Sequence, residues 1–187
     1  MSATVSLFIS IGLVGSVLGV CPNVISRAEW GAAPGETTSL RAHPATHVVL
    51  HHSETPTCTN QDNCMAIVRS IQKNHIKWLR YTDIGYNFLI GEDGNVYEGV
   101  GWGKMGKDNT SLDRVSIGIC MIGDFTSIMP SDKALTALRS LIGCGVERNH
   151  LSWDHRMVAH GQLKNTKCPG YKLYHHIRGW PNWSAYP

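Results

Sequence analysis

The chain has 187 residues, of which 42% are hydrophobic and 17% are charged, and its formal net charge at pH 7 is +3. This composition predicts one globular domain with a sizeable core and excludes an intrinsically disordered chain. The weak positive charge favours an anionic partner. No basic run with interleaved aromatic residues appears, so we expect no nucleic-acid partner.

Residues 1–19 have the pattern of a secretory signal peptide, and we expect residues 20–187 to form a single domain. Residues 1–20 carry no acidic or basic side chain, and small residues stand near Gly19. A membrane anchor is the alternative, but the apolar run is short for a span of about 20 residues and lacks a basic stop. We therefore expect a secreted, extracellular protein with no membrane association after cleavage of the signal peptide.

Six cysteines fit an oxidising compartment; they are Cys21, Cys58, Cys64, Cys120, Cys144 and Cys168. A Cys58–Cys64 disulfide can close the short polar loop between them. A Cys21–Cys144 disulfide can hold the mature N-terminus to a later helix. Cys120 lies in an apolar run, where a buried free thiol is ordinary. The sequence alone does not fix this pairing.

Helical and strand patterns alternate along the chain. Apolar, β-branched and aromatic runs predict strands at 46–51, 86–90, 96–98, 115–122 and 156–159. Apolar residues spaced three and four apart predict helices at 63–79, 132–148 and 171–178. Asp93-Gly94 predicts a hairpin turn, whereas residues 21–45 and 99–114 have no period and are expected to be irregular. The alternation predicts an α/β fold with a central mixed β-sheet flanked by helices.

Two predicted strands end at a histidine. His51 closes the strand at 46–51, His160 follows the strand at 156–159, and Cys168 stands one short polar loop further on. Two imidazoles and a thiolate are zinc ligands, and a set of three leaves the fourth position open, as in catalytic sites. The alternative is that such histidines arise by chance among the ten in the chain and that Cys168 pairs with another cysteine.

Five sequence blocks, in this order and spacing, resemble the peptidoglycan recognition proteins of the short secreted type, which are related to the phage-lysozyme type of zinc amidase. They are Val48–Ser53, Asp83–Gly91, Gly94–Gly99, Ser116–Ile119 and His160–Gly170. The resemblance extends over about residues 24–183, nearly the whole mature chain. It implies the amidase fold, with Zn²⁺ at the floor of a groove that binds peptidoglycan.

The resemblance also implies roles for five residues. The zinc ligands of catalytic members match His51, His160 and Cys168, the catalytic tyrosine matches Tyr86, and a threonine near the cysteine matches Thr166. The implied reaction is hydrolysis of the amide between the lactyl group of N-acetylmuramic acid and L-alanine. Tyr86 would orient the water or donate a hydrogen bond to the developing oxyanion, and Thr166 would support the same oxygen.

Four further residues are candidates for the substrate groove: His52, His75, Trp102 and Asp108. Packing is the alternative for His52, because adjacent strand residues point to opposite faces, and core packing is equally open for Trp102. Several positions depart from the family pattern. Val100 replaces an arginine that meets the extra carboxylate of diaminopimelate-type peptides, which favours the lysine type.

The sequence therefore predicts a secreted innate-immunity protein that binds bacterial peptidoglycan and cleaves it as a zinc-dependent N-acetylmuramoyl-L-alanine amidase. The alternatives are a non-catalytic peptidoglycan receptor and a directly antibacterial binding protein. Non-catalytic relatives typically lose the cysteine, so Cys168 favours the enzyme. The oligomeric state has no signal in the sequence.

Overall fold

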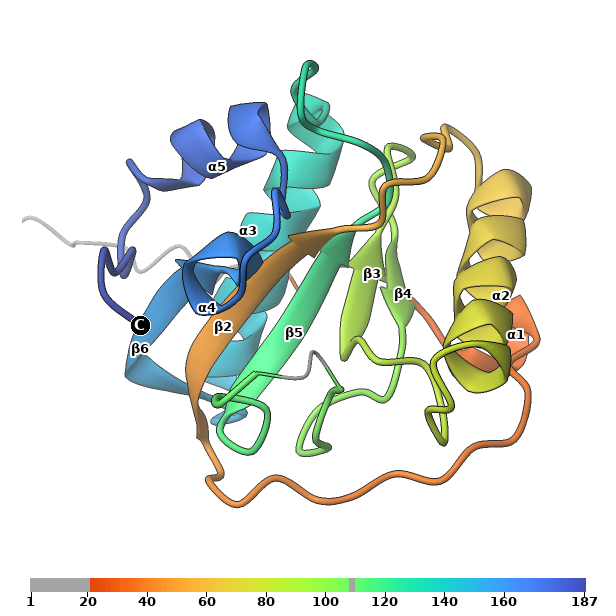
Figure 1. The fold of residues 1–187 in the computed structure, drawn as a ribbon, viewed down its shortest axis with the longest axis horizontal. Coiled ribbons are helices and arrows are strands. Elements are labelled where there is room, and N and C mark those ends of the chain that lie inside the picture. The colour runs from red at the N-terminus through yellow and green to blue at the C-terminus, as the bar shows by residue number, and fades with distance from the viewer. Residues whose placement is uncertain (1–20, 108–109) are drawn as a thin grey trace, which may run out of the picture.

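The strands of the described chain form a six-stranded sheet with the order β1-β4-β3-β5-β2-β6 (Figure 1). The structure is a computed structural model that describes residues 21–107 and 110–187. The strands are β1 (Val24–Ile25), β2 (Ala45–His52), β3 (Phe88–Ile90), β4 (Val96–Glu98), β5 (Ser116–Met121) and β6 (Leu151–Ala159). The β3–β4 hairpin is antiparallel, and the other neighbours pair in parallel. The sheet is therefore mixed, as predicted.

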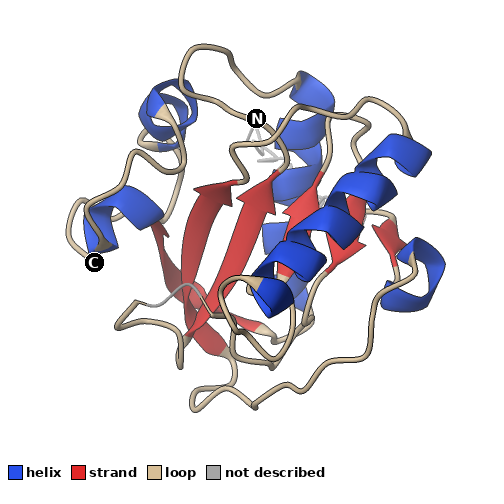
Figure 2. Ribbon diagram, turned by 45° about the vertical axis from the view of Figure 1, so that its right-hand side comes forward, coloured by secondary structure: helices blue, strands red, loops and turns tan. Residues whose placement is uncertain are grey.

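Helices cover both faces of this sheet (Figure 2). They are α1 (Arg27–Trp30), α2 (Gln61–Lys77), α3 (Asp132–Glu147), α4 (His160–Leu163) and α5 (Tyr171–Ile177). The apolar side of α3 packs on one face, in a cluster that includes Val48 and Leu50 of β2. The apolar side of α2 packs on the other face with Leu89 and Cys120. Alternation along β2 therefore assigns successive side chains to opposite layers.

The predicted helices and strands are confirmed, with shifts at their ends. Helix α2 begins at Gln61 rather than residue 63, because the side chain of Asn60 accepts a hydrogen bond from the amide of Asn63 and caps the helix. Ser131 caps α3 in the same way. Strand β6 begins at Leu151, five residues before its predicted start. Its early residues are mostly polar, so they lack the apolar pattern on which the prediction relied.

The segment 21–45 was expected to be irregular, and this was wrong in part. Strand β1 pairs with β4, and Ser26 starts helix α1 through a capping box with Glu29. Trp30 is fully buried, and its indole N–H donates to the carbonyl of Glu98 at 2.8 Å. A two-residue strand and a one-turn helix depend on distant partners, so the local sequence carries little signal for them.

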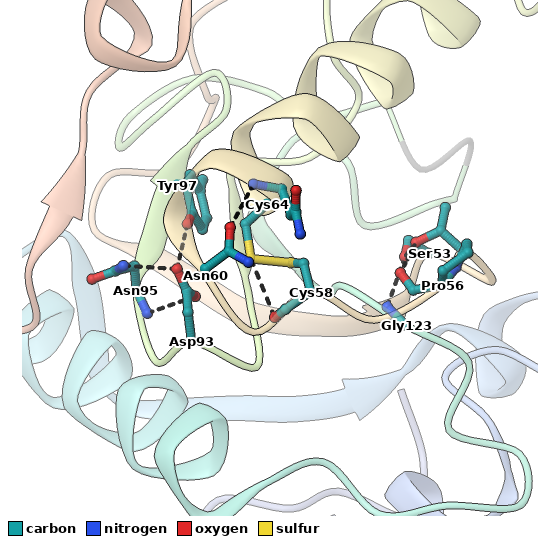
Figure 3. The surroundings of a disulfide bond; sticks show 11 residues. Ser53, Pro56, Cys58, Asn60, Cys64, Asp93, Asn95, Tyr97 and Gly123 are labelled. Carbon is teal, nitrogen blue, oxygen red and sulfur yellow. Dashed lines mark hydrogen bonds between the residues drawn. A yellow bond between two sulfur atoms is a disulfide. The ribbon is translucent and has the colours of Figure 1, made fainter.

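Both expected disulfides are present, between Cys58 and Cys64 and between Cys21 and Cys144. The first holds the loop after β2 to the first turn of α2, next to the β3–β4 hairpin (Figure 3). Cys120 and Cys168 are buried and belong to neither disulfide. The predicted signal peptide, residues 1–19, lies outside the described residues. No helix within the described residues has the length and apolar character to cross a membrane.

Candidate metal centre

His51 lies near the end of β2, on the sheet face opposite to α3. Val48 and Leu50 face α3, so alternation turns the imidazole of His51 to the other face. The side chain is 1% exposed. A polar ring buried to this extent needs partners in the folded protein.

His160 reaches the same place from β6. Strand β6 pairs in parallel with β2, with Ala159 beside Leu50, so the next residues of the two strands, His160 and His51, also lie next to each other. Helix α4 begins at His160, beside β2 and β6 (Figure 1). The centroids of the two imidazole rings are 4.5 Å apart.

Cys168 is held beside these rings by backbone hydrogen bonds. Its carbonyl accepts from the amide of Gly161 at 2.8 Å, and its own amide donates to the hydroxyl of Thr166 at 3.3 Å. Its Sγ lies 3.8 Å from Nδ1 of His51 and accepts from the amide of His52 at 3.3 Å. The cysteine is 7% exposed.

The donor atoms of His51, His160 and Cys168 lie within 4.8 Å of one another. Zinc bonds of about 2.0–2.3 Å in a tetrahedron place neighbouring ligand atoms roughly 3.3–3.8 Å apart. The upper limit of 4.8 Å is about 1 Å wider than that spacing, so binding would need the side chains to move together by about this much. Two imidazoles and one thiol also match the softness that zinc prefers. The residues present therefore fit a zinc ion.

Tyr86 and His75 extend the cluster along the same face. The ring of Tyr86 lies 5.2 Å from that of His51, and the ring of His75 lies 5.3 Å from Tyr86 in an edge-on arrangement. The amide of Gly85 donates to Nδ1 of His75 at 2.8 Å, which fixes that ring against the segment leading to Tyr86. A side chain at Gly85 would crowd His75 and the carbonyl of Lys107.

An ion pair between Arg27 and Asp83, which was not predicted from the sequence, supports the segment that leads to Tyr86. The carboxylate of Asp83, 3% exposed, accepts from the guanidinium of Arg27 at 2.8 Å and from the amide nitrogen of Gln72 at 2.8 Å. Asp83 thereby joins α1 and α2 to the turn that precedes Tyr86. The Asp-Ile-Gly turn was visible in the sequence, but its cationic partner lies 56 residues away.

His52 does not share a face of the sheet with His51. Its side chain is buried on the opposite face, where Nδ1 accepts from the amide of Phe125 at 3.2 Å. Burial disfavours the imidazolium ion and lowers the pKa of His52. The groove assignment was wrong for this residue, and the packing alternative holds because neighbouring strand residues alternate.

Trp102 is also placed away from the metal cluster. Its ring packs 4.5 Å from that of Phe88, which faces α3, and stacks on His150 at 5.1 Å. The groove assignment was therefore wrong for Trp102 too, since the glycine-rich loop returns this side chain to the α3 layer. Asp108, the fourth groove candidate, lies outside the described residues.

Comparison with known families agrees with this fold and cluster. A family model described as N-acetylmuramoyl-L-alanine amidase matches residues 41–171. A peptidoglycan recognition protein of Bombyx mori is 45% identical over 161 residues, covering 86% of this chain and 82% of the relative.

Solved structures show the same likeness. Drosophila peptidoglycan recognition protein SA aligns with a TM-score of 0.86 and 39% identity over 89% of this chain and 96% of that one. Peptidoglycan recognition protein LE, in complex with tracheal cytotoxin, aligns with a TM-score of 0.84 and 37% identity over 86% and 95%. The chain therefore belongs to the family of peptidoglycan recognition proteins, within the wider class of N-acetylmuramoyl-L-alanine amidase folds.

Proposed function

We propose that this protein binds bacterial peptidoglycan and hydrolyses its N-acetylmuramoyl–L-alanine amide bond with the help of zinc, as an extracellular protein of innate immunity. The observation that carries the proposal is the convergence of His51, His160 and Cys168 beside Tyr86. A receptor needs no such donor set, because binding a wall fragment requires no Lewis acid. The donor set is what a metal-assisted hydrolysis requires.

The ligand and the location are supported by independent observations. A relative of this fold binds tracheal cytotoxin, which is monomeric diaminopimelic acid-type peptidoglycan. The two disulfides are typical of an oxidising, extracellular compartment. The predicted signal peptide at residues 1–19 and the single domain at 20–187 belong to the same proposal.

In this mechanism His51, His160 and Cys168 would hold the metal, which would supply a Lewis acid for the scissile carbonyl and make water easier to deprotonate. The hydroxyl of Tyr86 donates a hydrogen bond to the developing oxyanion. The hydroxyl oxygen of Thr166 accepts from the amide of Cys168, so its hydrogen stays available for the substrate. Thr166 is exposed and can therefore reach a bound ligand.

The direct test is release of stem peptides from purified peptidoglycan by the mature protein, with added zinc and with a chelator. We expect release with zinc and none with the chelator. The relatives are recognition proteins by name, which favours a second candidate, a receptor that binds without cleaving. Peptidoglycan binding without release under either condition would establish the receptor and refute the enzyme.

Substitution Cys168→Ser tests the metal set itself. We expect loss of bound zinc and of hydrolysis, with peptidoglycan binding largely retained, because only one donor atom changes. Zinc content of the purified protein and peptidoglycan pull-down measure the two properties separately. Cys120→Ser is the matched control, since it removes the other buried cysteine that forms no disulfide, which lies on β5, the strand next to β2. Cleavage of peptidoglycan by the Cys168→Ser protein would contradict the zinc mechanism.

A further inference from the structure

His160, one of the three proposed zinc ligands, is the first residue of a helix that has little stability of its own. Helix α4 has four residues, little more than a single turn, and isolated helices of this length are unstable in water. The residue before it, Ala159, stands at the N-cap position and has no side-chain oxygen to accept a hydrogen bond from the first turn. The position of His160 must therefore be fixed by contacts from outside the helix.

Gln162 makes such contacts with both ends of its side-chain amide. Its oxygen, Oε1, accepts from the backbone amide of Ala159 at 2.8 Å. Its nitrogen, Nε2, donates to the backbone carbonyls of Ser184 at 2.9 Å and of Ala185 at 3.1 Å. A donor faces the oxygen and two acceptors face the nitrogen, so the partners match the chemistry of the amide group. Gln162 thereby joins the residue before His160 to a segment close to the end of the chain.

This segment, residues 182–186, is itself attached to β6, the strand that leads into α4. The amide of Met157 donates to the carbonyl of Asn182 at 2.8 Å, and the amide of Ser184 donates back to the carbonyl of Met157 at 2.9 Å. Figure 1 shows this last part of the chain beside β6 and α4. The segment is therefore a fixed support, and Gln162 links that support to the junction between β6 and α4.

We propose that Gln162 is a positioning residue of the metal centre. By fixing the junction of β6 and α4 to the segment beside it, Gln162 holds the imidazole of His160 in place, with its ring 4.5 Å from that of His51. The amide of Gly161 secures the loop that carries Cys168, so adjacent residues of α4 support different donors. This inference rests on the proposed function, because it gives Gln162 an effect on the binding of zinc.

Two substitutions test this role. Gln162→Glu keeps an oxygen for the amide of Ala159 but replaces both N–H donors by a carboxylate that faces two carbonyl oxygens, and Gln162→Ala removes all three hydrogen bonds. Both should lower zinc affinity about tenfold, as expected for the loss of a group that orients a ligand. Competition with a zinc chelator of known affinity measures the change. The visible absorption spectrum of the Co²⁺-substituted protein, which depends on the geometry of the ligands, should change as well.

Ser184→Ala is the matched control. It removes the hydroxyl that donates to the carbonyl of Tyr186 but keeps the carbonyl that accepts from Gln162, so zinc affinity and the cobalt spectrum should stay unchanged. Urea unfolding of the metal-free proteins is measured in parallel. A role of Gln162 in folding alone would lower the urea midpoint of its two variants and leave zinc affinity and the cobalt spectrum as in the original protein.

The outcomes separate this inference from the proposed function. Unchanged zinc affinity in both Gln162 variants, or an equal loss of affinity in Ser184→Ala, would overturn the positioning role while the original protein still binds zinc. An original protein that binds no zinc would overturn the proposed function and the positioning role together. None of these measurements requires cleavage of peptidoglycan.

Discussion

His51 and His160 meet because two parallel strands end side by side. The pairing of Leu50 with Ala159 places the two following residues at one sheet edge, and alternation turns both rings to the face opposite α3. The sequence predicts that each histidine follows an apolar strand, whereas the pairing of the two strands in this register is seen only in the structure. Cys168 is different, because its position depends on a loop closed by the Gly161 amide. The chemistry of Cys168 and its place one short loop after His160 suggested it as a ligand, and the family resemblance added to that suggestion.

Tyr86→Phe tests the proposed hydrogen-bond donor. The ring of Tyr86 lies beside His51, and removal of its hydroxyl deletes one hydrogen-bond donor without removing a metal ligand. We expect turnover of peptidoglycan to fall roughly 10²-fold, while zinc content and peptidoglycan affinity stay unchanged. Steady-state release of stem peptides provides the rate. An unchanged rate would remove Tyr86 from the mechanism.

The candidate groove residues differ in how well their positions can be predicted from the sequence. His75 does lie beside Tyr86, because helical spacing brings it to the inner side of α2. Trp102 stands in the glycine-rich segment 99–114, whose path is set by contacts with Phe88 and His150 and by no local pattern. A segment without hydrophobic period carries no information about which face of the sheet its side chains reach.

At the scale of elements, the short helix α4 and the loop behind it act as one unit. The amide of Gly161 in α4 donates to the carbonyl of Cys168, and a β-carbon at Gly161 would meet the backbone of Thr166 and Cys168 at 2.9 Å. Backbone atoms cannot yield as a flexible side chain can. Any larger residue at this position must therefore displace the loop that carries the proposed cysteine ligand.

Gly161→Ala is accordingly expected to lower zinc affinity by about tenfold or more, comparable to the loss of a group that orients a ligand. Competition with a zinc chelator of known affinity measures this change. Gly143→Ala is the control, because a β-carbon there meets nothing within 4 Å on α3. Equal zinc affinity in Gly161→Ala and the original protein would show that the loop tolerates the shift.

Longer elements were predicted more reliably than short ones for a physical reason. Helices α2 and α3 each bury an apolar side along four or more turns, so their period is visible in the sequence. Strand β1 and helix α1 consist of 2 and 4 residues, and they form because β4 and the Arg27–Asp83 pair are nearby. Their stability comes from tertiary contacts, which no local pattern records.

At the scale of the whole molecule, several histidines in different parts of the fold are partly or fully buried. Burial lowers the pKa of His47 on β2, of His150 after α3 and of His155 on β6, because it disfavours the imidazolium ion. Arg156 lowers the pKa of His47 further. For His155, hydrogen bonding to Ser152 acts in the opposite direction without overcoming the effect of burial.

These shifts predict that the protein loses stability as the pH falls below neutrality. The histidines of the unfolded chain take up protons near their ordinary pKa of about 6.5. In the folded protein the same histidines have lowered pKa values, so they take up protons only at a lower pH. The unfolded state thus binds more protons in this window, and the free energy of unfolding decreases as the pH decreases. Urea unfolding at pH 7.5 and 5.5 should give a lower midpoint at pH 5.5. A chelator is present at both pH values, so that loss of bound metal cannot cause the difference.

The variant His155→Gln should show a smaller difference between the two midpoints, because it lacks one of the histidines whose protonation favours unfolding. Equal midpoints in the original protein would contradict the prediction.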